Sequence, residues 1–295
     1  MSDADAHLRG VLHQAGVRAG VLTADARLIR HGTNALYQLP GGVIARVGPP
    51  GSSVVAGRQV EASRWLAGAG IPVVRVIDGI EQPTVVEGRP VTWWVQLPEH
   101  RPATPAELGA VLKRLHALAV PKCPVLSTVD PFEGLTESLD TGAFLAEGDR
   151  AWLQCLVERL RGEYRALLPG LSWCVIHGDA WQGNVVVPQC GEPVLLDLDH
   201  LGVGPREWDL VSLAADYTDF ARLARADYEA FVAAYGGYDM TTWSGYRTLA
   251  TIRELRWTAF VLGKANVNQK AVDEARHRVA CLRGEIDRPW SWLAF

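Results

Sequence analysis

The amino-acid sequence predicts an α+β fold with two lobes, a small β-rich lobe over residues 1–98 and a larger, mostly helical lobe over residues 99–295. Two patterns and the chain length favour this division. The segments before Pro98 read mainly as strands around one helix, and from Pro205 onward apolar residues recur at helical spacing. The 295 residues exceed a usual single domain, and 48% of them are hydrophobic, which is enough for a sizeable core.

The first lobe is expected to contain a hairpin, a helix and two further strands. Residues 28–48 form two β-rich stretches around a Gly-Gly pair, which is typical of a hairpin. Residues 54–68 have a helical rhythm that is closed by glycine. Residues 72–77 and 91–97 are predicted as strands because apolar and β-branched residues dominate them.

The second lobe begins with a well-marked helix over residues 104–116, with Thr at the N-cap and Pro at the first helical position. Residues 120–148 contain several Pro and Gly and are expected to be a long surface connection. The next helix starts near Arg150 and is predicted to stop at residues 169–170. The Trp-rich tail at 290–292 is expected to dock on this lobe.

Charge and cysteine content argue against several classes of protein. The formal net charge of −4 disfavours nucleic-acid or anionic-membrane binding. The five Cys are scattered without a C-x-x-C pair, which fits reduced thiols better than disulfides or a zinc site. The acidic N-terminus and the lack of an apolar run of about 18 residues predict neither a signal peptide nor a membrane span. We therefore expect a cytoplasmic protein, a monomer or a homodimer.

Residues 173–199 hold the side chains that point to chemistry. A short apolar strand ends just before Asp179, and two further apolar strands flank a turn rich in Gly and Pro. With the turn centred in that loop, Asn184 lies opposite Asp197, with both side chains on one face. Asp199 is expected to lean to the same side if the strand continues.

Oxygen ligands of this kind suit Mg²⁺ far better than zinc. Asp179 precedes Asn184 by five residues, and Asp197 follows the hairpin, which is the order of residues in kinases. There the first Asp accepts the proton of the attacking hydroxyl, while the Asn and the later Asp hold Mg²⁺ on the nucleotide phosphates. The alternative is that all three residues merely form turns.

The stretch HGDAWQGNVVV, followed by LLDLDH, resembles the aminoglycoside phosphotransferase and choline kinase-like family of small-molecule kinases with a protein-kinase-like fold. The resemblance covers roughly residues 25–260. It implies a bilobal fold, ATP as phosphate donor with GTP not excluded, Mg²⁺ as cofactor and a small-molecule hydroxyl as acceptor. It makes Asp179 the catalytic residue and Asn184 and Asp197 the metal ligands. Asp209, which starts a later helix, is expected to support the structure by capping that helix, by tying down the backbone of the catalytic loop as the resemblance implies, or by both.

The resemblance also implies a nucleotide site in the first lobe. Gly32, Thr33 and Asn34 match the nucleotide loop, Arg46 the base on the third strand, and Glu61 the acidic partner of that base. The first 112 residues contain no lysine, so Arg46 is expected to anchor the phosphates through its forked, permanently charged guanidinium. A simple surface ion pair between Arg46 and Glu61 is the alternative.

Adenine is expected to lie along residues 92–97, with Trp94 and Gln96 as contacts. Because side chains alternate along a strand, Trp93 and Trp94 are expected to place one ring in the core and the other toward solvent or adenine. Only twelve residues separate Asp197 from Asp209, which leaves no space for the activation segment of a protein kinase. This spacing favours a small-molecule acceptor.

The acceptor is expected to be an aminoglycoside, an amino-sugar or another hydroxylated amine such as choline, in antibiotic resistance, catabolism or self-protection. Trp181, Asp216, Asp219, Glu254 and Trp257 are the candidates for contacting it. The alternative is that these acids are solvated on helix faces and that these tryptophans belong to the core.

Two other classes of function stay open. One is a binding or regulatory protein that keeps the kinase fold without turnover. The other is a metal-dependent phosphohydrolase that uses Asp197, Asp199 and His200, although it leaves residues 32–61 without a role.

Overall fold

The computed structural model describes residues 3–140, 144–167, 171–265 and 268–295. The chain forms two compact units. The first comprises residues 1–103, 121–126 and 182–201, and the second comprises residues 104–120, 127–181 and 202–295. Sheet dominates the first unit and helix the second, so the predicted α+β class, with a small β-rich part and a larger helical part, is confirmed.

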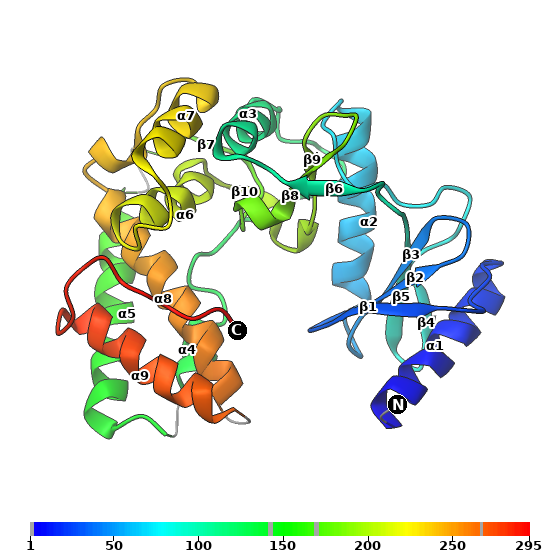
Figure 1. The fold of residues 1–295 in the computed structure, drawn as a ribbon, viewed down its shortest axis with the longest axis horizontal. Coiled ribbons are helices and arrows are strands. Elements are labelled where there is room, and N and C mark those ends of the chain that lie inside the picture. Colours follow the sequence, from blue (N-terminus) through cyan, green and yellow to red (C-terminus); the bar gives the residue numbers. More distant parts are fainter. Residues whose placement is uncertain (1–2, 141–143, 168–170, 266–267) are drawn as a thin grey trace. The chain divides into compact units, whose positions relative to one another are not determined.

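An antiparallel sheet and two helices form most of the first unit (Figure 1). The strand order is β1-β2-β3-β5-β4. The strands are β1 (Arg27–His31), β2 (Ala35–Leu39), β3 (Val43–Val47), β4 (Thr84–Val86) and β5 (Arg89–Val95). The helices are α1 (Asp3–Ala19) and α2 (Ser53–Gly68). The predicted hairpin is the β2–β3 pair, and the predicted helix is α2.

The two helices bury opposite faces of this sheet. Leu8 and Val11 of α1 share a core cluster with Trp93. Val60 of α2 shares another with Trp94. Trp93 is 0% and Trp94 6% exposed, so the prediction that one ring faces solvent or adenine is wrong. The reason is that both sides of the strand are covered: α1, which was not predicted, packs on the side of Trp93, and α2 packs on the side of Trp94.

The hairpin β8 (Val185–Pro188) and β9 (Val194–Leu195) pairs with β6 (His100–Pro102) in a three-stranded sheet. Short 3₁₀ turns flank it, η2 (Gln182–Asn184) and η3 (Leu198–His200). Because β8 bonds to β6, the hairpin belongs to the first unit, whereas the predicted division at residue 98 puts it in the second.

Residues 72–77, predicted as a strand, form only isolated bridges to Leu195 and Trp94. Val73 pairs with Leu195 and Val76 pairs with Trp94, so this segment does not pair continuously with any single strand. The strand prediction is therefore wrong. Its bonds nevertheless tie the hairpin to the rest of the first unit, since the N–H of Val74 donates to the carbonyl of Leu195 at 2.9 Å.

The second unit has a two-stranded antiparallel sheet surrounded by helices (Figure 1). The strands are β7 (Trp173–Ile176) and β10 (Gly202–Pro205). The helices are α3 (Pro105–His116), α4 (Leu135–Asp140), α5 (Glu147–Leu167), α6 (Glu207–Thr218), α7 (Arg225–Tyr235), α8 (Tyr246–Ala265) and α9 (Gln269–Arg283), with a 3₁₀ turn η4 (Met240–Thr242). The predicted α3 and the helical character after Pro205 are confirmed. Among the described residues, no helix combines the length and the apolar character that crossing a membrane requires.

The segment expected to be a surface connection contributes to the core instead. Phe132, Leu135 and Leu139 are 2–3% exposed, and the last two lie on α4. Pro and Gly in this stretch therefore separate a short packed helix from its neighbours, and the expectation is wrong for this part. The predicted helix stop at residues 169–170 lies outside the described residues.

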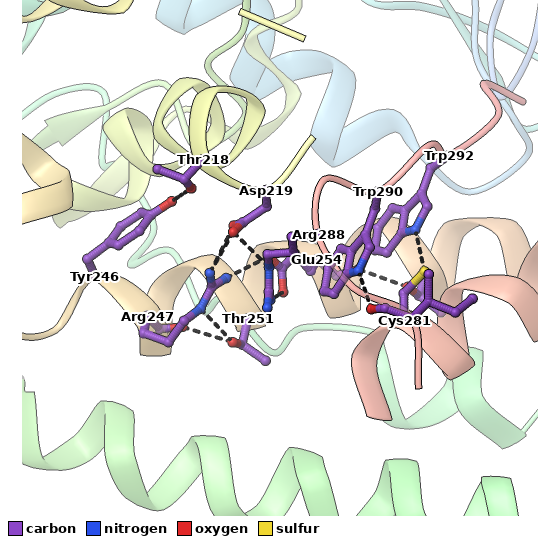
Figure 2. A network of polar contacts seen from close by, with 12 residues as sticks. Thr218, Asp219, Tyr246, Arg247, Thr251, Glu254, Cys281, Arg288, Trp290 and Trp292 are labelled. Carbon is purple, nitrogen blue, oxygen red and sulfur yellow. Dashed lines mark hydrogen bonds and ion pairs between the residues drawn. The ribbon is translucent and has the colours of Figure 1, made fainter. Parts of the chain in front are cut away.

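The C-terminal tail docks on the helices of the second unit, as predicted. The rings of Trp290 and Trp292 stack with centroids 5.4 Å apart, and Phe220 packs edge-on against both. The indole N–H of Trp292 donates to the Cys281 sulfur at 3.4 Å (Figure 2). The tail is thus held by an aromatic cluster, together with a backbone hydrogen bond from the N–H of Trp290 to the carbonyl of Asp219 at 2.7 Å.

The capping box at the start of α3 can be tested for its contribution to stability. Thr104 Oγ1 accepts the N–H of Glu107 at 3.3 Å, and Glu107 Oε2 accepts the N–H of Thr104 at 2.7 Å. Thr104→Ala should lower the free energy of unfolding by about 1 kcal/mol, measured by urea unfolding, because the first turn loses this acceptor. Thr104→Ser keeps the hydroxyl and should stay close to wild type. An alanine variant as stable as wild type would contradict the capping role.

Candidate active site

The loop after β7 is held by one buried carboxylate. Asp209 of α6 is 0% exposed and accepts the backbone N–H of His177 at 2.7 Å and that of Gly178 at 2.8 Å. His116 Nε2 lies 3.0 Å from the same carboxylate. Burial raises the pKa of Asp209, but the hydrogen bond and charge of His116 and the His177 backbone outweigh it, so the pKa lies below its ordinary value.

Asp209 serves the loop and not its own helix. The residue before α6, Arg206, forms no side-chain cap. The Asp209 carboxylate instead bonds to two consecutive N–H groups of the loop, which fixes the backbone just before Asp179. This is the position that the family resemblance implies for it.

Gly178 occupies a backbone conformation that favours glycine. Its φ of 82° lies in the left-handed region, where a side chain is strained. Its carbonyl accepts the indole N–H of Trp208 at 3.0 Å and Arg253 Nη2 at 3.4 Å. The glycine therefore lets the loop turn just before Asp179, and its carbonyl accepts hydrogen bonds from two side chains.

Asp179 follows this turn with its side chain 41% exposed. Arg253 Nη1 donates to its Oδ1 at 3.2 Å. The sequence analysis did not select Arg253, although an arginine between Ile252 and Leu255 on a mostly apolar helix is a signal of a buried partner. Trp181, two residues after Asp179, is 51% exposed.

In the first unit, Arg46 and Asp199 form an ion pair. Arg46 Nη2 lies 2.8 Å from Asp199 Oδ1 and 2.5 Å from Oδ2. With its amide oxygen turned toward Arg46, Asn34 accepts from Nη2 at 2.7 Å and from Nε at 3.2 Å. Burial raises the pKa of Asp199, but the hydrogen bond and charge of Arg46 outweigh it and leave the pKa below its ordinary value.

Glu61 is not the partner of Arg46 in this structure, contrary to expectation. Glu61 is exposed, whereas Gln59 is 4% exposed and lines a cavity of about 90 Å³ beside Arg46. Two residues on a helix point about 200° apart, so Gln59 and Glu61 face opposite sides of α2. Asp199, on η3, takes the place expected for Glu61.

The small cavity gathers most of the expected phosphate-binding side chains. Its lining includes Thr33, Asn34, Arg46, Thr92 and Asp199. Strand β3 carries the guanidinium, and the loop between β1 and β2 carries the hydroxyl and the amide. Gly32 precedes these residues, and its N–H donates to the carbonyl of Asn34 at 3.1 Å.

Of the two expected adenine contacts, Trp94 is arranged differently from the prediction. Trp94 is 6% exposed and donates its indole N–H to Thr92 Oγ1 at 2.8 Å, so its ring is part of the core. Gln96 follows the end of β5 and donates its backbone N–H to the carbonyl of Gly42 at 2.8 Å.

Asn184 and Asp197 were predicted to be cross-strand partners, but in the structure they are not. Val186 pairs with Val194, one residue away from the predicted register, and the N–H of Leu196 donates to the carbonyl of Asn184 at 2.8 Å. Asp197 has φ 53° and ψ 67°, in the left-handed region that Asp tolerates. The shared-face argument is therefore wrong, because β9 ends early and a left-handed turn sets the direction of Asp197.

Asn184 and Asp197 nonetheless lie on adjoining segments of the first unit, joined by the Leu196 hydrogen bond. They offer amide and carboxylate oxygens. Within the part of the chain that the structure describes, no three His, Cys, Asp or Glu residues are grouped to hold a metal ion by themselves.

The acids expected to attract a cationic acceptor are paired with arginines (Figure 2). Asp219, 2% exposed, contacts Arg247 Nη1 at 2.9 Å and Arg288 Nε at 2.8 Å. Glu254, 0% exposed, contacts Arg247 Nη2 at 2.5 Å. Arg288 belongs to the C-terminal tail, so these acids anchor the tail to α6 and α8.

Asp216 and Trp257 also have internal partners. Asp216 Oδ1 lies 3.2 Å from Arg222 Nη1, and burial raises its pKa. Trp257 packs edge-on against Phe220, with ring centroids 5.7 Å apart, beside the tail. Of the candidates for contacting the acceptor, Trp181 is the side chain that stands most open.

The model of the phosphotransferase enzyme family matches residues 25–249 of this chain. The chain belongs to this family. The resemblance found in the sequence is thereby confirmed.

Two curated proteins are similar to this chain. An aminoglycoside 3'-phosphotransferase of Streptomyces fradiae is 29% identical over 236 residues, which cover 69% of this chain and 84% of that protein. An uncharacterised protein of Deinococcus radiodurans is 34% identical over 164 residues, 53% of this chain. This match spans 46% of the length of the Deinococcus protein.

Solved structures support the fold. A choline/ethanolamine kinase family protein from Mesorhizobium loti matches this chain with a TM-score of 0.62 and 19% identity. The match covers 94% of this chain and 95% of that one. The protein-kinase-like fold expected from the sequence is confirmed.

Glu254 makes the stability of the protein depend on pH. Burial raises its pKa from 4.5 to about 8, and a hydrogen bond with Asp219 adds to this while Arg247 opposes it. Between these two values the folded state binds more protons than the unfolded state, so this contribution to stability falls as pH rises. Glu254→Gln removes the titration.

We therefore expect the melting temperature of Glu254→Gln minus that of wild type to increase as the pH is raised from 5 to 9. Thermal melts by circular dichroism across this range measure the difference. The exposed Glu61→Gln is the control and should show no such trend. If this difference in melting temperature stays constant or decreases with pH, Glu254 is ionised in the folded protein over the whole range from pH 5 to pH 9.

Proposed function

We propose that this phosphotransferase moves the γ-phosphate of ATP to a hydroxyl of a small molecule, with Asp179 orienting and deprotonating that hydroxyl. The observation that carries the proposal is the loop His177–Asp179, whose backbone is bonded to the buried Asp209 and whose Asp179 side chain is 41% exposed. A fixed carboxylate at an accessible turn is what general-base orientation of a hydroxyl needs. Membership of the phosphotransferase enzyme family supports the same reaction.

The nucleotide phosphates are assigned to Arg46. Its guanidinium has five N–H donors, of which some are taken by Asn34 and Asp199, and both polar and apolar side chains line the small cavity beside it. A guanidinium grips phosphate oxygens in a fork, so this arginine is suited to do what a lysine does in other kinases.

Asn184 and Asp197 are assigned to Mg²⁺. Their amide and carboxylate oxygens are hard donors, which fits Mg²⁺, an ion that keeps several waters and takes few protein ligands besides phosphate. When bound, Mg²⁺ supplies neutralisation of charge on the nucleotide phosphates. Asp197 itself has a left-handed backbone conformation, two residues after the end of β9.

The acceptor is proposed to be a hydroxylated amine, such as an aminoglycoside or an amino-sugar. The support comes from the similarity to an aminoglycoside 3'-phosphotransferase. The late-helix acids Asp219 and Glu254 add no support, since arginines already pair with them. Antibiotic resistance, catabolism and self-protection are roles that this acceptor class would serve.

A first experiment tests the reaction and the role of Asp179. Purified protein is screened by thermal shift with hydroxylated amines in the presence of Mg-ATP or Mg-GTP, and phosphate transfer is then measured on the compounds that stabilise it. Asp179→Ala should lower kcat by about 10³-fold, because general-base orientation is worth about 10²–10⁴-fold.

The outcomes separate the candidate functions. Transfer that survives Asp179→Ala unchanged refutes the role given to Asp179. Nucleotide binding without transfer to any compound favours a binding protein that keeps the fold. Phosphate release that needs no organic acceptor favours a phosphohydrolase.

A second experiment tests Arg46. Arg46→Ala should raise the KM for the nucleotide at least about tenfold, because charge-assisted hydrogen bonds of about 1.5–3 kcal/mol are lost. Glu61→Gln is the matched control and should leave this KM unchanged, since Glu61 is exposed on the side of α2 opposite Gln59. Initial-rate kinetics with varied nucleotide measure both. An equal increase in the nucleotide KM in both variants would instead favour the pairing of Arg46 with Glu61.

A further inference from the structure

We infer that Arg253 is a positioning residue that sets the orientation of the Asp179 carboxylate, an inference that rests on the function proposed above. Arg253 lies on α8, and its Nη1 donates to Asp179 Oδ1 at 3.2 Å. The side chain of Arg253 is 3% exposed and that of Asp179 is 41% exposed. The guanidinium therefore holds the carboxylate from the protein side, and the open side is left for an acceptor.

The same guanidinium is fixed to the backbone of the loop. Its Nη2 lies 3.4 Å from the carbonyl oxygen of Gly178 and 3.1 Å from that of Trp208. Its central carbon lies 4.1 Å from the centre of the Trp208 ring, and the Trp208 indole N–H donates to the Gly178 carbonyl at 3.0 Å. Because the guanidinium is planar and rigid, these contacts set where its remaining edge meets Asp179.

Burying the charged guanidinium of Arg253 costs free energy, so a need to fill space does not explain why an arginine stands here. Burial lowers the pKa of Arg253 to about 10, and its Nε has no hydrogen-bond partner among the described residues. An unbranched apolar side chain would fill the same space without a buried charge. Such a side chain would lose the ion pair with Asp179 together with the hydrogen bonds to the carbonyls of Gly178 and Trp208.

Orientation of this carboxylate matters for phosphate transfer. Catalysis of this reaction comes almost entirely from positioning and electrostatic stabilisation, and the catalytic Asp acts on the acceptor hydroxyl. A displacement of about 1 Å in such a group can cost about 100-fold in rate. Loss of Arg253 should therefore lower kcat and leave the binding of both substrates nearly unchanged.

Two substitutions form a matched pair of buried arginines. Arg253→Met removes the ion pair with Asp179. Arg278→Met removes an arginine of α9 that bonds Glu274 and the carbonyls of Trp257 and Leu293. Arg253→Met should lower kcat by about 100-fold with little change in either KM. Arg253→Lys keeps the charge and should recover part of this loss. Arg278→Met should keep the wild-type kcat.

A double-mutant cycle separates positioning from general support of the fold. In an Asp179→Asn background, Arg253→Met should cause almost no additional loss of kcat, because the group on which it acts has already been changed. Melting temperatures of all variants report on folding. Equal losses of kcat in the wild-type and Asp179→Asn backgrounds would overturn the inference.

A readout that needs no turnover keeps this test apart from the test of the proposed function. In ¹⁵N NMR spectra of the arginine guanidinium groups, Asp179→Asn should shift the Nη resonances of Arg253 and leave those of Arg278 in place. Unchanged Arg253 resonances would overturn the inference. If no acceptor is turned over but the Arg253 resonances shift, the proposed function fails while the ion pair stands.

Discussion

The hydrogen bonds of the buried Asp209 carboxylate are the interactions on which the loop that carries Asp179 depends. This carboxylate is fully buried and bonds the loop after β7, while His116 on α3 contacts it from another part of the sequence. An ionised carboxylate can be buried only when several donors compensate it. The start of α6, the end of β7 and the end of α3 must therefore meet correctly before Asp179 has a defined position.

Buried arginines supply hydrogen bonds to several buried acceptors in this chain. Arg253 bonds a carboxylate and two carbonyls, and Arg278 bonds Glu274 and the carbonyls of Trp257 and Leu293. A guanidinium has five donors in a fixed plane, so it can satisfy several acceptors at once, which an ammonium group on a flexible chain does less well. The scarcity of lysine in the sequence agrees with this use.

Short sequence patterns correctly predicted the elements that begin or end at a characteristic residue. Thr104 and the following proline marked the start of α3, and glycines marked the β2–β3 hairpin and the end of α2. The register of β8 and β9 was predicted one residue away, because the loop between them does not turn about its centre. α1 was missed even though Leu8, Val11, Leu12 and Ala15 follow helical spacing.

The sequence by itself determined the residue types and their order, with Asp179, Asn184, Asp197 and Asp209 at spacings that point to phosphate transfer. Only the tertiary structure decided their partners. It paired Arg46 with Asp199 and not with Glu61, and it brought Arg253 to Asp179 from 74 residues away. The physical reason is that spacing fixes which face of an element a side chain occupies, whereas the partner on that face depends on how distant segments pack.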